Sequence, residues 1–232
     1  MTASAIAVRH LTRTFGTRTV LRDINFEVPT GSVLCLMGAN GSGKTTLLEI
    51  LATVLSPTSG RVAIHGRDVN LEGTAVRRLV GYGLSTLHSF YPQLSARQNL
   101  EFFAAVHGLA RRQARARTNL LLDALGLRDA ASTRVQEFSD GMTAKLSIAR
   151  ALIADPPVLL LDEPTKSLDE DARRIVREIA LTPTARRAPR SLVWTTHDRA
   201  EAFALGDAVC ALEDGEVRSI GGPARLAAVG DW

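Results

Sequence analysis

The sequence of 232 residues predicts an α/β fold with a mixed, mainly parallel sheet at its core. Strand-like apolar segments alternate with helical segments, which is typical of parallel strands joined by helices. Three strand-like segments precede the first helix, and we expect an antiparallel β portion at the N-terminus. Residues from about 85 to 154 are mostly helical, which predicts a helical subdomain inserted into the α/β core. We expect a single domain over residues 1–232.

The first half of the chain predicts strands around one helix. Alternation of apolar and polar residues, or a continuous apolar run, indicates each strand. Turns at Pro29-Thr30-Gly31 and Pro57-Thr58-Ser59-Gly60 separate the elements. In order, we expect strands at 5–8, 24–28 and 33–37, a helix from Lys44 to about Leu55, and a strand at 61–64.

The second half predicts helices first and strands later. Apolar residues recur at helical spacing in the helical block and again after the next strand. Glu213-Asp214-Gly215 is a turn sequence typical of a β-hairpin. In order, we expect helices within 96–125 and at 140–154, a strand at 158–161, a helix at about 169–180, and strands at 191–194, 209–212 and 216–220.

Composition and charge exclude several classes of protein. The chain is 45% hydrophobic and 22% charged, unlike a disordered or fibrous chain. No uncharged apolar stretch approaches the roughly 18 residues that span a bilayer, and Met1 to Val8 lack the basic start of a secretory signal. Cys35 and Cys210 lie in apolar stretches, so we expect buried thiols in a reducing cytosol.

The net charge of +4 permits contact with nucleic acid or anionic lipid but requires neither. The densest basic cluster consists of Arg111, Arg112, Arg115 and Arg117. We interpret it as a solvated face of a helix.

Residues 38–45 form a phosphate-binding motif. Their sequence, Gly38-Ala39-Asn40-Gly41-Ser42-Gly43-Lys44-Thr45, fits G-x-x-x-x-G-K-[ST] between an apolar strand and a helix. Backbone N–H groups and the helix N-terminus would attract phosphate oxygens. Lys44 would reach the β- and γ-phosphates, and the Thr45 hydroxyl would ligate Mg²⁺. A dinucleotide-binding loop fits less well, because Thr46 stands where its third glycine belongs; we include Thr46 among the ATP-binding residues.

Two carboxylates follow the apolar strand at 158–161. Asp162 and Glu163 would leave the sheet beside the phosphate-binding loop. Asp162 suits the magnesium shell, directly or through water, and Glu163 suits polarisation of an attacking water.

Together with four further segments, these motifs resemble the ATP-binding cassette (ABC) family over nearly the whole chain. Phe138-Ser139-Asp140-Gly141-Met142 lies where that family has its L-S-G-G-Q signature. Ser167-Leu168-Asp169 is similar to its D-loop, Thr195-Thr196-His197-Asp198 to its switch-histidine segment, and Phe15-Gly16 to its adenine-stacking aromatic loop.

The resemblance implies a P-loop ATPase with ATP and Mg²⁺ as its ligands. Phe15 would stack on adenine, and His197 would hold the γ-phosphate and orient the water with Glu163. Two cassettes would form a head-to-tail homodimer or pseudo-dimer with ATP at the interface. Each ATP would also contact the signature of the other chain in trans, through Ser139, Asp140, Gly141 and Met142, and Asp169 would contact the other chain.

The resemblance also implies a separate transmembrane permease as partner, and a cytoplasmic position on the inner face of the cell membrane. Ser89-Phe90-Tyr91 and the segment 97–104 resemble the branch that exports polysaccharides, lipids and drugs. Because the sequence ends at Trp232, we expect no regulatory domain of the kind that many importers have. The aromatic residues near Phe90 and Phe102 would offer a groove to a permease helix, or they are ordinary helical core.

Three residues depart from the family pattern. Asp140 replaces the first glycine of the signature, where it either caps the helix or repels a γ-phosphate; Met142 replaces its glutamine. Ser85 replaces a glutamine that would ligate magnesium and water, and Lys166 replaces a small residue in the D-loop.

Two alternatives remain open on the sequence. The first is a soluble cassette that acts on nucleic acid or the ribosome; such proteins typically have two cassettes or a long coiled coil, so we expect no nucleic-acid partner. The second is a regulatory cassette that hydrolyses ATP poorly. Glu163 and His197 argue against it, whereas Ser85 and Asp140 leave it open.

Overall fold

The computed structural model describes residues 4–84, 89–183 and 189–224. The strands are β1 (Ser4–Phe15), β2 (Arg18–Pro29), β3 (Val33–Met37), β4 (Ser59–Ile64), β5 (Arg67–Asp68), β6 (Val80–Leu84), β7 (Val158–Asp162), β8 (Ser191–Thr196), β9 (Ala208–Glu213) and β10 (Glu216–Gly221). The helices are α1 (Lys44–Leu51), α2 (Gly73–Arg77), α3 (Ala96–Val106), α4 (Arg111–Ala124), the 3₁₀ helix η2 (Val135–Glu137), α5 (Asp140–Leu152), α6 (Glu170–Leu181) and α7 (Arg199–Leu205).

These strands form two sheets. The smaller sheet has the order β2-β1-β4-β5 and is antiparallel throughout. The larger sheet has the order β10-β9-β3-β8-β7-β6 and is parallel except for the β9–β10 hairpin. The predicted fold class, a mainly parallel sheet with an N-terminal antiparallel portion, is therefore confirmed.

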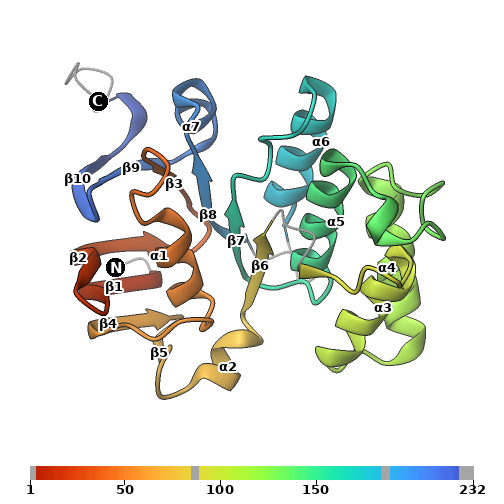
Figure 1. The fold of residues 1–232 in the computed structure, drawn as a ribbon, viewed down its shortest axis with the longest axis horizontal. Helices are drawn as coiled ribbons and strands as arrows, with labels where there is room; N and C mark the ends of the chain where they lie inside the picture. Colours follow the sequence, from red (N-terminus) through yellow and green to blue (C-terminus); the bar gives the residue numbers. More distant parts are fainter. Residues whose placement is uncertain (1–3, 85–88, 184–188, 225–232) are drawn as a thin grey trace.

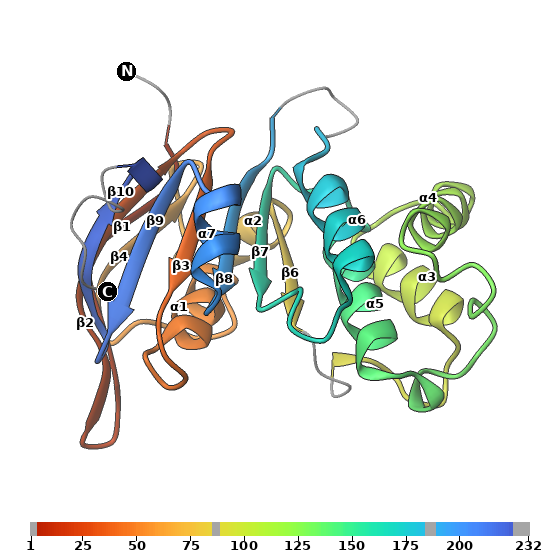
Figure 2. The ribbon, with the colours of Figure 1, turned by 90° about the horizontal axis from the view of Figure 1, so that it is seen from above.

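The larger sheet has an apolar core on each face. On one face, α1 packs between the two sheets, and Leu21, Leu47 and Leu160 share one core. On the other face, Leu159 and Trp194 share a second core with α5 and its neighbouring helices. Figures 1 and 2 show the antiparallel sheet at one end of the long axis and α3 and α4 at the other.

The parallel strands bring distant segments of the chain to one edge. β3, β8, β7 and β6 run side by side in the same direction, so their carboxyl ends lie together. Ligands of open α/β sheets bind at this edge. The residues after β3, β7 and β8 are those in which the sequence predicts phosphate-binding and catalytic groups.

Several predicted boundaries differ from the structure. β1 and β2 are much longer than the predicted strands, because bulges around His10 and Asp23, with φ of 49° and 46°, break the alternating pattern. Helix α1 ends at Leu51 rather than near Leu55, because Thr53 takes a left-handed conformation with φ of 62°. The short helices α2 and α7 were not predicted.

The basic cluster on α4 is only partly solvated. Arg111, Arg112 and Arg115 are exposed, as predicted. Arg117 instead lies 3.0 Å from Asp155 Oδ1, and the buried Arg190 lies 2.8 Å from the same oxygen. The prediction of a solvated face is therefore wrong for Arg117, because a neighbouring carboxylate compensates its charge.

Cys35 and Cys210 are buried and form no disulfide. Burial raises the pKa of each thiol to about 12, with a smaller contribution from Glu201 and Asp207 at Cys35. The predicted burial of both thiols is confirmed. Within the described residues, the helices are too short or too polar to cross a membrane.

Candidate functional site

The loop between β3 and α1 needs glycine at several positions, and Gly43 and Gly38 show the reason most clearly. Gly43 precedes the first turn of α1 with φ of 108°, and a Cβ atom there would lie 2.7 Å from Leu21 Cδ2. At Gly38 a Cβ atom would lie 2.3 Å from the carbonyl oxygen of Leu212. The loop therefore follows the tight path that the phosphate-binding motif requires.

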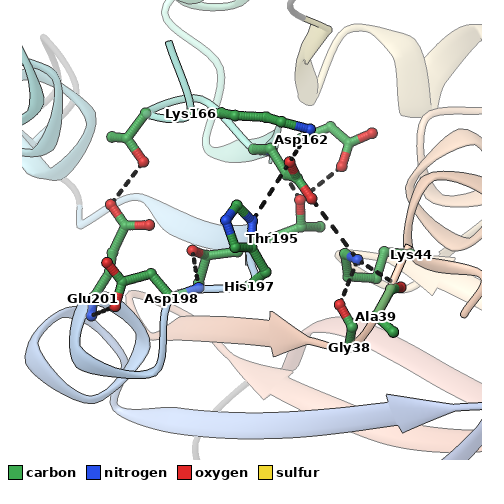
Figure 3. Close-up of polar contacts among 12 residues, drawn as sticks. Gly38, Ala39, Lys44, Asp162, Lys166, Thr195, His197, Asp198 and Glu201 are labelled. Carbon is green, nitrogen blue, oxygen red and sulfur yellow. Dashed lines mark hydrogen bonds and ion pairs between the residues drawn. The ribbon is translucent and has the colours of Figure 1, made fainter. Parts of the chain in front are cut away.

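Lys44 holds a largely buried ammonium inside this loop. Its Nζ donates to the carbonyl oxygens of Gly38, at 2.7 Å, and Ala39, at 3.1 Å (Figure 3). Burial lowers the pKa of Lys44, and the nearby carboxylates of Glu163 and Asp162 partly oppose that shift. The loop thus encloses a cation that phosphate oxygens could reach.

Thr45 and Asp162 form a pair of oxygen donors. Thr45 Oγ1 donates to Asp162 Oδ2 at 2.6 Å, which joins the first turn of α1 to the end of β7. Hydroxyl and carboxylate oxygens suit Mg²⁺, which usually takes one or two protein ligands together with substrate phosphates. The described residues contain no cluster of three or more His, Cys, Asp or Glu side chains suited to a metal. The donor set therefore fits a magnesium ion that is held partly by a nucleotide.

Glu163, directly after β7, lies close to two lysine side chains and one histidine side chain. Its Oε2 is 3.1 Å from Lys166 Nζ and 3.7 Å from His197 Nδ1, and its Oε1 is 3.9 Å from Lys44 Nζ. Partial burial disfavours the charged form, but the hydrogen bond and charge of Lys166, followed by the charges of Lys44 and His197, outweigh it. The pKa of Glu163 is therefore below its usual value. An ionised carboxylate in this position can accept a proton.

A cavity of about 520 Å³ lies between the loop and the end of β7. Its volume is within the range of small-molecule sites. Predicted site residues that line it are Asn40, Gly41, Gly43, Lys44, Thr45, Thr46, Asp162 and Glu163; residues not singled out for binding are Arg18, Val20, Leu84, Ala144, Lys166 and Ser167. Ser42, within the loop, is buried. His197, Glu163 and Lys166 line a smaller cavity of about 140 Å³.

Phe15 does not line the larger cavity. Its ring is 43% exposed, and the guanidinium of Arg13 lies 4.2 Å from the ring centroid. The cavity wall on this side comes instead from Arg18 and Val20 of β2. Stacking of Phe15 on adenine therefore stays a prediction.

The signature segment forms the start of α5. Ser139 is the N-cap, and its Oγ accepts a hydrogen bond from Met142 N at 3.2 Å. Asp140 is thus not the cap but an exposed acidic residue in the first turn, which corrects one of the two interpretations of this departure. Among Ser139, Asp140, Gly141 and Met142, none lines the cavity of its own chain. Ser85 lies outside the described residues.

Thr195 belongs to the segment that resembles the switch-histidine segment, but the sequence pattern assigns it no role of its own. Its buried hydroxyl contacts both Asp162 and the backbone of Glu163. The available signal was a polar residue at the end of β8, next to the strand with the two carboxylates. The sequence pattern does not show that β7 and β8 are neighbours in the sheet, so the position of Thr195 beside the two carboxylates could not be predicted.

Three comparisons with known proteins agree with this geometry. Residues 21–166 match the family model described as ABC transporter. The chain is 34% identical over 228 residues to the Nod factor export ATP-binding protein I of Paraburkholderia xenovorans, and the match covers 98% of this chain and 74% of that protein. It is 32% identical over 221 residues to the Fe(3+) ions import ATP-binding protein FbpC of Vibrio cholerae, with 95% and 62% covered.

A solved structure is also similar over most of the chain. It is the dimeric structure of a post-hydrolysis state of the ATP-binding cassette MJ0796 bound to ADP and Pi. The TM-score is 0.85 at 26% sequence identity, with 94% of this chain and 98% of that chain covered.

Proposed function

We propose, because this chain belongs to the ABC transporter family of ATP-binding proteins, that it powers export of a substrate through a separate membrane permease. The chain is the ATP-binding subunit of an ABC transporter, an ATPase that forms ADP and phosphate from ATP and water. The proposal depends above all on one observation: Lys44, Thr45, Asp162 and Glu163 surround a single cavity. We place it in the cytoplasm, on the inner face of the membrane, as one domain with a helical subdomain over about residues 85–154.

Each residue of the site has a distinct proposed role. Lys44 and the loop N–H groups bind the phosphates. Thr45 and Asp162 hold Mg²⁺, which when bound neutralises phosphate charge. Glu163 accepts the proton of the attacking water as the bond from the γ-phosphorus to the β–γ bridging oxygen breaks, and His197 orients that water.

We also propose that the signature acts in trans within a head-to-tail dimer. The exposed first turn of α5 presents backbone N–H groups and the positive end of the helix dipole, which favour an anion. A facing chain could bring its nucleotide to this surface. The proposal predicts that one site of the dimer contains Lys44 of one chain and Ser139 of the other.

Mixed dimers test this geometry. Pairing a Lys44→Ala chain with a Ser139→Arg chain leaves one intact site if the signature acts in trans, so we expect residual ATPase activity that neither variant has alone. The mirror pairing joins a wild-type chain to a Lys44→Ala/Ser139→Arg chain and leaves no intact site. Differently tagged chains, purified as heterodimers, allow the two rates to be compared. Activity only in the mirror pairing would place the signature in cis, and no activity in either would remove the support for trans action.

Asp140→Gly tests the same interface by removing the negative charge of the Asp140 side chain. If the carboxylate faces the γ-phosphate of the other chain, its removal relieves a repulsion on the order of 1 kcal/mol or more. We expect ATP-driven dimerisation to strengthen by about tenfold, since 1.4 kcal/mol is tenfold in an equilibrium constant. Analytical ultracentrifugation in a Glu163→Gln background measures it, with Asp140→Asn as the isosteric control.

A different result is expected if Asp140 does not face the nucleotide of the other chain. If the carboxylate interacts only with its own helix, both substitutions leave dimerisation unchanged and lower the stability of the chain by about 0.3–1 kcal/mol. The Ser139 cap remains in either variant, so loss of the cap cannot explain the result.

The proposal of export and the proposal of a permease contact rest on different observations. The aromatic segment divides into Phe90, which is buried, and Tyr91 and Phe102, which are 48% and 39% exposed with ring centroids 4.8 Å apart. We propose the exposed Tyr91–Phe102 pair as a contact for a permease helix. The relatives include an export protein and an import protein, so similarity alone does not give the direction.

Direction can be measured without knowing the cargo. Mass spectrometry of medium and cell extracts would compare cells that express the wild-type chain with cells that express Glu163→Gln. For an exporter, we expect at least one compound to fall in the medium and rise in the cells of the variant. The reverse change for the affected compound would show import and overturn the proposal.

A further inference from the structure

Thr195 occupies the one position of β8 that faces both proposed catalytic carboxylate residues. Parallel pairing aligns Leu161 of β7 with Trp194 of β8, so the next residues along, Asp162 and Thr195, lie beside each other. The Thr195 side chain is fully buried. Solvent does not reach this side chain, so its hydrogen bonds within the protein fix the direction of its hydroxyl group.

Those hydrogen bonds define a directed chain. The backbone N–H of Glu163 donates to Thr195 Oγ1 at 2.8 Å, and Thr195 Oγ1 donates to Asp162 Oδ1 at 2.6 Å (Figure 3). The amide N–H can only donate, so Thr195 Oγ1 accepts from it. The single proton of the hydroxyl is then donated to the carboxylate of Asp162, which can only accept. Thr45 donates to the other oxygen, Oδ2. Both oxygens of Asp162 thus have fixed partners.

The same hydroxyl supports an unusual backbone at Glu163. Glu163 has φ of 44°, in the left-handed region that residues other than glycine rarely adopt. Such conformations persist where surrounding contacts hold them. The bond from Glu163 N to Thr195 is one of these contacts, and the turn directs the Glu163 side chain toward Lys44, Lys166 and His197.

We propose that Thr195 is a positioning residue that couples the orientation of Asp162 to that of Glu163. It fixes Oδ1 of Asp162 so that Oδ2 faces Thr45, and it fixes the backbone turn that places the Glu163 carboxylate. Hydrogen-bond partners behind metal ligands typically affect metal affinity or activity by about 10–100-fold. This inference rests on the roles proposed above for Asp162 and Glu163.

Thr195→Val removes the hydroxyl and keeps the shape of the side chain. We expect turnover to fall about 10–100-fold, and Thr195→Ser to restore it to within about threefold of wild type, because serine keeps the hydroxyl. Calorimetric titration of the full chain with ATP provides a readout besides activity. With EDTA, affinity should stay near the wild-type value, whereas the gain in affinity from added Mg²⁺ should shrink by about tenfold.

The control is a buried threonine outside the site. Thr118 on α4 is fully buried, and its hydroxyl has no hydrogen-bond partner among the described residues. Thr118→Val should leave turnover and the magnesium effect at wild-type values. Should Thr195→Val fail to fold, Thr195→Ala in the same titrations makes the same prediction.

The outcomes separate this inference from the proposed function. If Thr195→Val has wild-type turnover and a wild-type magnesium effect, the proposed role of Thr195 is overturned. An equal loss of ATP affinity with EDTA and with Mg²⁺ would also overturn it, because that result indicates a merely structural role. Glu163→Gln and Asp162→Asn are measured in parallel. If those two variants are impaired while Thr195→Val is not, only the role of Thr195 fails; if they too behave as wild type, the proposed function itself fails.

Discussion

Glu163→Gln is expected to leave ATP binding intact and to reduce turnover by about 10²–10⁴-fold. An amide cannot accept the proton of the attacking water, whereas the wild-type carboxylate is ionised, and the nearby Lys166 and Lys44 favour its charged form. Phosphate release from ATP, together with a separate measurement of ATP affinity, would distinguish loss of chemistry from loss of binding.

The same variant should trap the dimer. With hydrolysis blocked, ATP and Mg²⁺ should shift the chain from monomer to dimer in size-exclusion chromatography. Glu178→Gln makes the identical chemical change at an exposed position of α6 and should behave as wild type. Rapid turnover by Glu163→Gln would exclude this residue as the base. A chain that stays monomeric across physiological ATP concentrations would indicate that dimerisation needs the permease, which co-expression would test.

Lys44→Ala is expected to weaken ATP binding by roughly a hundredfold or more. Hydrogen bonds to charged groups contribute about 1.5–3 kcal/mol each, and Lys44 is expected to contact two phosphates. Its removal also deletes the cation that bonds the carbonyl oxygens of Gly38 and Ala39, so the loop would lose its internal support.

Equilibrium titration with ATP measures this effect directly. The matched control is Lys145→Ala, because Lys145 is one of the chain's few other lysines and does not line the nucleotide cavity. Thermal unfolding of both variants checks that the chain remains folded. Unchanged affinity in Lys44→Ala would refute the phosphate-binding assignment.

Much of the site could be predicted because its residues are contiguous. Lys44 and Thr45 belong to one short motif, and Asp162 and Glu163 end one apolar strand. Thr195 could not be predicted in this way, since it lies 33 positions from Asp162 and meets it only through pairing of β7 with β8.

Local conformation explains the other differences between prediction and structure. The periodic pattern predicted the parallel strands β3, β7, β8 and β9 because each is short, apolar and regular, but it missed β6, whose five residues include two glycines. It failed along β1 and β2, where bulges shift the register. At the start of α5, Ser139 and Asp140 are both good capping residues, and only backbone geometry shows that Ser139 takes the position.

The close packing at Gly43 and Gly38 sets a lower limit on the size of a working fragment. Leu21 from β2 lies against one glycine and Leu212 from β9 against the other, while Arg18 and Val20 form part of the cavity wall. A truncated chain that begins at β3 would keep every residue of the phosphate-binding motif but would lose one side of the surface that shapes it. We therefore expect nucleotide binding to depend on both sheets together, and removal of the N-terminal hairpin to weaken it.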